Sequence, residues 1–150
     1  MARSIQRMIE NIKEKYALDF VAVTNVYMQP YETNLRWEYA VGNIGERFKR
    51  IVLKSGKGIA GIVYKTGKPM HVENTEEAFT DDTLFNYPII VSEKIKSMCA
   101  IPLYEQNRVK GVVLLGFREK DKMTIELYDK ILGNIEADFQ YIYHKEMVTK

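Results

Sequence analysis

The clearest folding pattern in the sequence is a β-hairpin over residues 97–117. Two apolar segments, residues 97–104 and 108–117, flank the polar turn Glu105-Gln106-Asn107. Apolar runs separated by so short a polar turn are typical of adjacent antiparallel strands. This feature favours an antiparallel sheet over a fold that alternates strands with crossover helices.

Further strands are predicted upstream of this hairpin. Residues 20–27 and 35–41 form a second hairpin pattern with a longer polar loop, and residues 48–53 and 69–72 are shorter strand candidates. Strict alternation in the strand over residues 35–41 places one set of side chains on one face and the intervening set on the other. The first set is Leu35, Trp37, Tyr39 and Val41, and the second is Arg36 and Glu38.

Amphipathic helices are predicted at both ends of this strand region. Apolar residues recur at spacings of three and four near each end, and Thr124 stands where an N-cap is expected for the second helix. Each apolar stripe must pack on the sheet, on the other helix, or on a partner helix or second copy. The stripes are Ile5, Met8, Ile9, Ile12 and Tyr16 in the first helix and Ile125, Tyr128, Leu132, Ile135, Phe139 and Ile142 in the second.

These elements predict an α+β fold. We expect one domain over residues 1–150, because the chain has 150 residues and shows no repeat or linker. The domain is expected to hold an antiparallel sheet of about six strands, a helix at each terminus and a helix-and-loop excursion over residues 73–96.

Composition narrows the classes of function. The formal net charge is +2 and the basic residues are scattered, which argues against a nucleic-acid partner. Cys99 has no second cysteine to pair with, and two histidines, His71 and His144, are too few and too far apart for a zinc cluster. The apolar run over residues 112–115 is too short to cross a bilayer, and the N-terminus has no signal-peptide pattern. We therefore expect a cytoplasmic protein without a membrane partner.

Residues 56–61, Gly56-Lys57-Gly58-Ile59-Ala60-Gly61, match the pattern G-x-G-x-x-G. A dinucleotide-binding fold is nevertheless excluded, because the following helix ends by residues 67–69 and a long loop and a hairpin follow in place of parallel strands. Glycines before a helix expose backbone N–H groups, which together with the helix dipole form a site for an anion. With Ile59 and Ala60 as walls, such a site suits a small, weakly hydrated anion. The alternative is that the glycines only close a tight turn.

The glycine segment and the hairpin together resemble the GAF domain family. Residues 56–69, ending in Thr66-Gly67-Lys68-Pro69, are similar to the family signature G-[IL]-x-G-x-[VA]…T-G-x-P. Residues 97–116 are similar to its S-x-x-x-[IV]-P-[LI]…G-[VI]-[LV] hairpin. The resemblance implies that the N- and C-terminal helices pack on one face of the sheet and that a loop and helix ligand cover lies on the other. Such domains bind cyclic nucleotides, bilins, haem, small metabolites or ions, so the fold alone does not name the ligand.

Within this family the chain looks most similar to single-domain nitrate receptors. The likeness rests on Trp37, on the helix-opening pair Ile59-Ala60 and on Tyr87-Pro88-Ile89-Ile90. It implies a small apolar pocket in which nitrate is held by the indole of Trp37 and by backbone N–H groups of residues 59, 60 and 89. It also implies that Leu53 and Tyr87 line this pocket. The candidate ligand-binding residues are therefore Trp37, Leu53, Gly58, Ile59, Ala60, Tyr87, Pro88 and Ile89.

The resemblance further implies a signalling role without catalysis. Receptors of this kind restrain a sensor histidine kinase that controls genes of nitrate and nitrite respiration, and nitrate lifts the restraint. The implied ligand is nitrate, without a cofactor or metal, and the implied partners are the kinase and, from the helical stripe, a weak homodimer. Nitrate is planar and carries no proton at neutral pH, so it needs directed donors, and an indole N–H can only donate.

Other interpretations compete with this one. A GAF module for a cyclic nucleotide or a tetrapyrrole is the main alternative. Methionine sulfoxide reductases with this fold exist, but they need more than one cysteine, so Cys99 is interpreted as a core residue. His71 is interpreted as a hydrogen-bonded strand residue, and Asp81-Asp82 as the solvated start of a helix.

Overall fold

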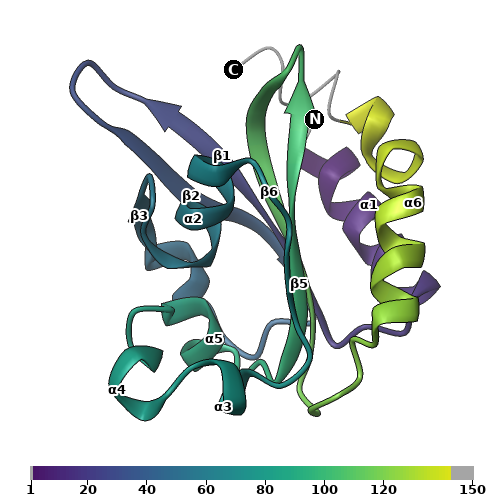
Figure 1. Ribbon diagram of the computed structural model, residues 1–150. Coiled ribbons are helices and arrows are strands. Elements are labelled where there is room, and N and C mark those ends of the chain that lie inside the picture. The colour runs from purple at the N-terminus through teal and green to yellow at the C-terminus, as the bar shows by residue number, and fades with distance from the viewer. Residues whose placement is uncertain (1, 143–150) are drawn as a thin grey trace.

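The computed structural model describes the backbone of residues 2–142 and the side chains of residues 5–139. Six antiparallel strands form one sheet in the order β3-β2-β1-β6-β5-β4 (Figure 1). This architecture confirms the predicted α+β class and its antiparallel sheet. Residues 143–150, with His144, lie outside the described part, and the prediction of one domain over residues 1–150 stays a prediction. The strands are β1 (Phe20–Met28), β2 (Thr33–Val41), β3 (Val52–Lys54), β4 (Met70–Val72), β5 (Ser97–Glu105) and β6 (Arg108–Phe117).

Helices cover both faces of this sheet. As Figure 1 shows, α1 and α6 lie together on one face, whereas α2 to α5 lie on the other. The two faces therefore carry separate cores. The helices are α1 (Ala2–Lys15), α2 (Gly58–Thr66), α3 (Thr75–Ala78), α4 (Asp81–Leu84), α5 (Pro88–Ser92) and α6 (Ile125–Ile142), with a 3₁₀ turn η1 (Arg47–Arg50).

The apolar stripes of α1 and α6 pack onto the sheet, as one of the predicted alternatives had it. Ile9 of α1 is fully buried, and Phe139 of α6 is buried in the same core as Val113 of β6. Ile131, outside the predicted stripe, also joins this core, whereas Ile125 is 49% exposed. The side chain of Ile142 lies outside the described side chains.

We call the buried cluster on the opposite face the α2–α5 core. Burial of its apolar side chains stabilises the packing of the short helices on this side of the sheet. The core joins residues from strands and from the short helices of the excursion over residues 73–96. Its buried members are Phe20, Ala22, Leu35, Trp37, Ala40, Phe48, Leu53, Ile59, Ala60, Val63, Ile89, Ile90, Ile95, Met98, Ala100, Val112 and Leu114.

A β-bulge in β2 overturns the predicted alternation of that strand. Val23 of β1 pairs with Tyr39, but the next residue, Thr24, pairs with Trp37, so Glu38 is an extra residue in β2. A bulge of this kind shifts the side-chain alternation by one residue. Trp37 therefore lies in the α2–α5 core, whereas Tyr39 packs against the core of α1 and α6. The prediction that both share one face is wrong.

The predicted strand over residues 48–53 is also only partly correct. The chain first forms η1, closed by a hydrogen bond of 3.2 Å from the Ile51 N–H to the Phe48 carbonyl, and only residues 52–54 pair as β3. Phe48 is buried in the α2–α5 core, while the basic residues around it are exposed. The buried side chain of Phe48 alone attaches this segment to the core. The segment therefore needs no strand with alternating buried and exposed residues.

The predicted turns and caps are confirmed. Gln106 and Asn107 both have positive φ angles, 53° and 65°, as a two-residue hairpin turn between twisted strands requires. The hydroxyl of Thr124 accepts a hydrogen bond of 3.2 Å from the Leu127 N–H and so caps α6. Among the described residues, no helix combines the length and the apolar character that a bilayer crossing demands.

We predict that Ile9→Ala lowers the free energy of unfolding by about 2–5 kcal/mol, because it leaves a cavity where α1 meets the sheet. Ile9 is 0% exposed. Urea denaturation followed by circular dichroism measures the change. The matched control Glu10→Ala, on the exposed side of α1, should change the value by less than about 0.5 kcal/mol. Equal losses in the two variants would contradict the packing of α1 described above.

Candidate functional site

The connection from β3 to α2 is a tight glycine turn. The Gly56 N–H donates to the Gly61 carbonyl at 2.8 Å, and the Lys57 N–H donates to the Lys54 carbonyl at 2.9 Å. Gly58 has a φ of +67°, which a residue with a side chain rarely adopts. A Cβ on Gly61 would lie 2.3 Å from the Lys54 carbonyl oxygen. The glycines therefore bring the end of the strand directly against the start of the helix.

The first turn of α2 presents backbone donors in apolar surroundings. The N–H groups of Gly58, Ile59 and Ala60 belong to the first three helical residues and have no acceptor within the helix. No side chain caps this end, and Ile59 and Ala60 are both 0% exposed. The helix dipole adds a positive potential at the same place. The turn thus provides N–H groups for an anion without supplying a charged side chain.

Trp37 contributes a further buried donor. Its side chain is 2% exposed, and its Nε1 has no hydrogen-bond partner among the described residues. Leaving a buried donor unmatched costs about 1–3 kcal/mol. The bulge at Glu38 places this side chain in the α2–α5 core, where Ile59 and Ala60 also lie.

The start of α5 adds a third element. Tyr87 is its N-cap, Pro88 is its first residue, and Ile89 is 1% exposed in the α2–α5 core. The Tyr87 carbonyl accepts the Ile90 N–H at 3.0 Å, whereas the Ile89 N–H, in the first turn, has no acceptor within the helix. The Tyr87 ring stacks on Phe79, with 4.3 Å between centroids, and this contact fixes the entry into α5.

The structure therefore brings the eight candidate residues to one region. Five are buried members of the α2–α5 core and Tyr87 packs against it, while Pro88 opens α5. Gly58 faces Leu53 so closely that a Cβ would lie 2.7 Å from Leu53 Cδ2. Their role in ligand binding stays a prediction. The five buried members are Trp37, Leu53, Ile59, Ala60 and Ile89.

The surroundings of this region are partly open. A cavity of about 380 Å³ lies between η1 and α5 and is lined by Arg47, Ile51 and Pro88 among others. Pro88 is thus a candidate residue at the boundary between the core and this cavity. Lys54, the last residue of β3, pairs with Glu32 at 3.5 Å, and Lys57 is exposed.

Sequence reasoning missed a buried carboxylate at the end of α5. Glu93 is 0% exposed, and its Oε1 accepts from Arg118 Nη2 at 2.6 Å and from the Ile44 N–H at 2.9 Å. Arg118 also donates from Nε to the Glu93 carbonyl at 2.9 Å and from its backbone N–H to Asp19 at 2.8 Å. Glu93 thus ties α5 to β6 and to the loop after β2. A glutamate after a short apolar segment carries no signal that would reveal this role.

The other chemical candidates have structural roles. His71 Nε2 lies 2.6 Å from the Met123 carbonyl oxygen, and its ring stacks on Tyr128 at 4.5 Å, which confirms its interpretation as a hydrogen-bonded strand residue. Cys99 is buried in the core under α1 and α6. Asp81 and Asp82 are exposed in the first turn of α4. Within residues 5–139, no cluster of His, Cys, Asp and Glu suits a metal ion.

The chain belongs to the GAF domain family, whose model matches residues 2–128. Two solved structures of mutated NreA protein, altered in the nitrate binding site, from Staphylococcus aureus are similar to it. One is 36% identical, with a TM-score of 0.75, over 79% of this chain and 86% of that chain. The other is 31% identical, with a TM-score of 0.77, over 87% of this chain and 98% of that chain. No curated protein matches the chain.

A more distant structure shows the fold alone. The type II free methionine-R-sulfoxide reductase from Thermoplasma acidophilum is 14% identical, with a TM-score of 0.70, over 95% of this chain and 92% of that chain. This likeness prompts the question whether Cys99 is reactive. Burial raises the pKa of the Cys99 thiol above its ordinary value, which disfavours the thiolate that acts as nucleophile.

We predict that Cys99 in the folded protein reacts with a disulfide reagent at about pH 8 at least about a hundredfold more slowly than in denaturant, because labelling requires local opening. Release of the chromogenic thiol measures the rate. The denatured protein is the control for full labelling. Equal rates in the folded and denatured protein would show that Cys99 is accessible and would reopen the reductase interpretation.

Proposed function

We propose that this protein is a cytoplasmic sensor that binds nitrate reversibly in the α2–α5 core and carries out no chemical reaction on it. The observation that carries the proposal is the buried indole Nε1 of Trp37, which has no partner among the described residues. A donor in that state favours a guest that only accepts hydrogen bonds. The backbone N–H groups at the start of α2 supply further donors in the same core.

The chemistry of nitrate matches this donor set. Its three oxygens accept hydrogen bonds in one plane, and its single charge is delocalised, so it loses less hydration on burial than a phosphate ester. The Trp37 indole and the N–H groups of Ile59, Ala60 and Ile89 are the donors that we assign to it. Moving an anion into an apolar core is unfavourable unless directed donors replace its water. The dipole of α2 favours the negative charge at the same position.

The composition of the core favours a small anion over a large one. Among the described residues, no arginine or lysine is buried. Arginine pairs bidentately with phosphate and carboxylate groups, and sites for larger oxyanions commonly use it. The similarity to the NreA structures, at 31% and 36% identity, supports nitrate as the guest.

We predict that nitrate binds the purified protein with micromolar affinity and that Trp37→Phe weakens binding by about 1.5–3 kcal/mol, the value of a hydrogen bond to a charged group. Phenylalanine keeps an aromatic ring in the core and removes only the N–H donor and part of the volume. Isothermal titration with nitrate, chloride and sulfate in parallel measures the affinity and the selectivity.

The control for this experiment is Phe48→Leu, which disturbs the packing of the same core without removing a donor and should change nitrate affinity much less. Absence of nitrate heat in the parent protein would overturn the proposal. Unchanged affinity in Trp37→Phe would exclude the indole from the site. A tetrapyrrole absorption band, or a cyclic nucleotide released on denaturation, would assign a different ligand of the family.

We further propose that nitrate controls contact with a sensor histidine kinase through α5. Ile89 would bind the ligand at one end of α5, while Glu93 anchors the other end through Arg118 and Ile44. Binding would therefore fix the position of α5 against η1. Fixing α5 in this way would alter the neighbouring protein surface. Two apolar side chains are exposed on that surface, Phe85 at 72% and Val91 at 48%.

The kinase contact is tested with Phe85→Ser and with the control Tyr31→Ser, an exposed aromatic residue at the tip of the β1–β2 hairpin. We expect a histidine kinase from the source cells to be retained by the immobilised parent protein, to be released by nitrate, and to be lost in Phe85→Ser. Affinity for nitrate should stay the same in both variants. Mass spectrometry of the retained proteins gives the result. Two results would contradict this contact. One is retention of the kinase that nitrate does not change, and the other is an equal loss of retention in Tyr31→Ser and Phe85→Ser.

A further inference from the structure

The sheet is split between two of its central strands. β1 continues to Met28 and β6 begins at Arg108, but the two strands pair only between residues 20–23 and residues 113–116. Figure 1 shows the β1–β2 hairpin diverging from the β5–β6 hairpin beyond this point, with α2 between them. Residues 25–28 and 108–111 therefore present backbone edges toward each other without a ladder between them.

A side chain ends the ladder. The hydroxyl of Thr24, which is fully buried, accepts a hydrogen bond of 2.9 Å from the Val112 N–H. This bond takes the N–H that a continuing strand pair would use. The outer edges remain paired, since Val26 pairs with Leu35 on β2 and Glu105 on β5 pairs with Arg108. The unpaired edges are therefore the edge of β1 that faces β6 and the edge of β6 that faces β1.

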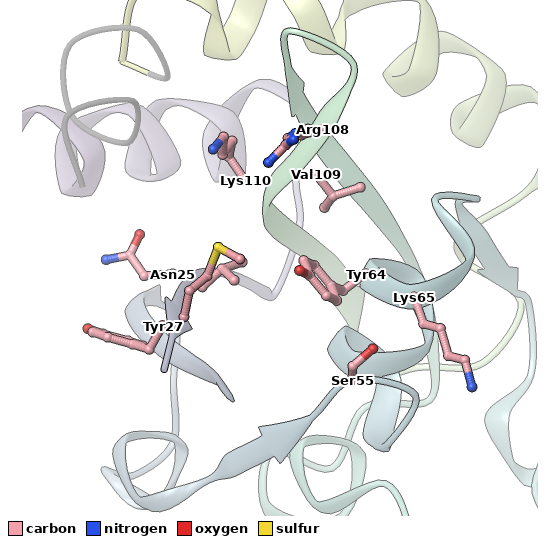
Figure 2. Close-up of a pocket in the computed structure, with 10 residues that line it drawn as sticks. Asn25, Tyr27, Ser55, Tyr64, Lys65, Arg108, Val109 and Lys110 are labelled. Atoms are coloured by element: carbon pink, nitrogen blue, oxygen red, sulfur yellow. The ribbon is translucent and has the colours of Figure 1, made fainter. Parts of the chain in front are cut away.

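The split contains a cavity of about 610 Å³, which we call the β1–β6 notch (Figure 2). Its walls are residues 25–28 of β1 and residues 108–110 of β6, and Tyr64 and Lys65 of α2 also line it. In the close-up Asn25 and Tyr27 lie on one side of the opening, Arg108 and Lys110 on a second side, and Tyr64 of α2 across from Asn25 and Tyr27. The notch therefore has the two strand edges as walls and the C-terminal part of α2 alongside them.

The charged side chains that line the notch are all basic. Lys65, Arg108 and Lys110 line it, no acidic residue does, and none of the three forms an ion pair with a residue in the described range. Asn25 lines it as well, and its buried Nδ2 has no described hydrogen-bond partner. Val109 packs partly buried against the α2–α5 core.

We propose that the β1–β6 notch is a docking site for an extended acidic peptide segment of a partner protein. The segment pairs its backbone with the open edge of β1 or β6, which is the interaction that an unpaired strand edge offers. β6 has a β-bulge at Lys110, since Leu103 of β5 pairs with Gly111 and the next residue, Tyr104, pairs with Val109. We place apolar side chains of the segment against Tyr64 and Val109, and acidic side chains against Arg108 and Lys110. The charge of the three basic residues selects an acidic segment.

A small anion fits these observations less well than a peptide does. A small anion would bind the basic side chains, but the backbone groups of the two strand edges would then hydrogen-bond only to water. Backbone N–H and C=O groups in a partly enclosed place favour a partner that supplies both donors and acceptors. This docking does not require nitrate, since none of the eight candidate nitrate residues lines the notch.

The test uses the full chain and a fluorescein-labelled, end-capped peptide, Asp-Val-Glu-Val-Asp-Val-Glu. We expect binding with a Kd below about 1 mM by fluorescence anisotropy. The double variant Arg108→Ser/Lys110→Ser should weaken it about fivefold or more through loss of two ion pairs. The matched control Lys68→Ser/Lys120→Ser removes two exposed cations elsewhere and should leave it unchanged. Alternate N-methylation of the peptide should weaken binding about tenfold, because backbone donors are lost.

Hydrogen exchange locates the contact. Amides of residues 25–28 and 108–111 should exchange more slowly with peptide bound, while those of α6 stay unchanged. Three results would overturn the proposal: no binding of the peptide, equal binding of the N-methylated form, or displacement of the peptide by inorganic phosphate at equal concentration. Self-association of the parent protein that Arg108→Ser/Lys110→Ser abolishes would assign the notch to a second copy instead and would also overturn it.

Discussion

One extra residue in β2 decides what each face of the sheet contains. Because Glu38 is bulged, Trp37 enters the core under α2 and α5, while Tyr39 packs under α1 and α6. The Tyr27 hydroxyl donates to the Glu38 carboxylate, which gives the bulged residue a partner on β1. Without the bulge, one face would have to accommodate both aromatic rings. The candidate site therefore depends on a backbone irregularity as much as on the tryptophan itself.

Most of the fold could be predicted from the sequence, because its signals are local. The hairpin turn at residues 105–107, the Thr124 cap and the glycine turn before α2 each rest on the conformational preference of a few neighbouring residues. Long apolar stripes likewise specify the two terminal helices. The failures lie at residues 48–53 and at Glu38. Both are set by contacts with distant segments, which a local pattern does not contain.

The candidate site and its surroundings also contain some features that the sequence predicts and some that it does not. Its glycine turn is visible as a motif, and the resemblance to nitrate receptors within the GAF family implies Trp37 and the segment from Tyr87 to Ile89 as further candidates. The ion pair of the buried Glu93 with the partly buried Arg118 could not be predicted, since the two residues are far apart in sequence and neither stands in a motif. Removing Arg118 would leave the buried Glu93 carboxylate without its cation, so this substitution is expected to destabilise the fold.

The donors at the start of α2 belong to the main chain rather than to side chains. Replacing Ile59 or Ala60 by a larger or smaller apolar residue would change the volume next to these N–H groups without deleting any of them. In the site that we propose, such replacements would change the size of the guest that fits, while the N–H donors for a negative charge stay in place. On this proposal, we expect proteins with different apolar residues at these two positions to bind anions through the same main-chain donors and to differ in the ionic radius that they favour.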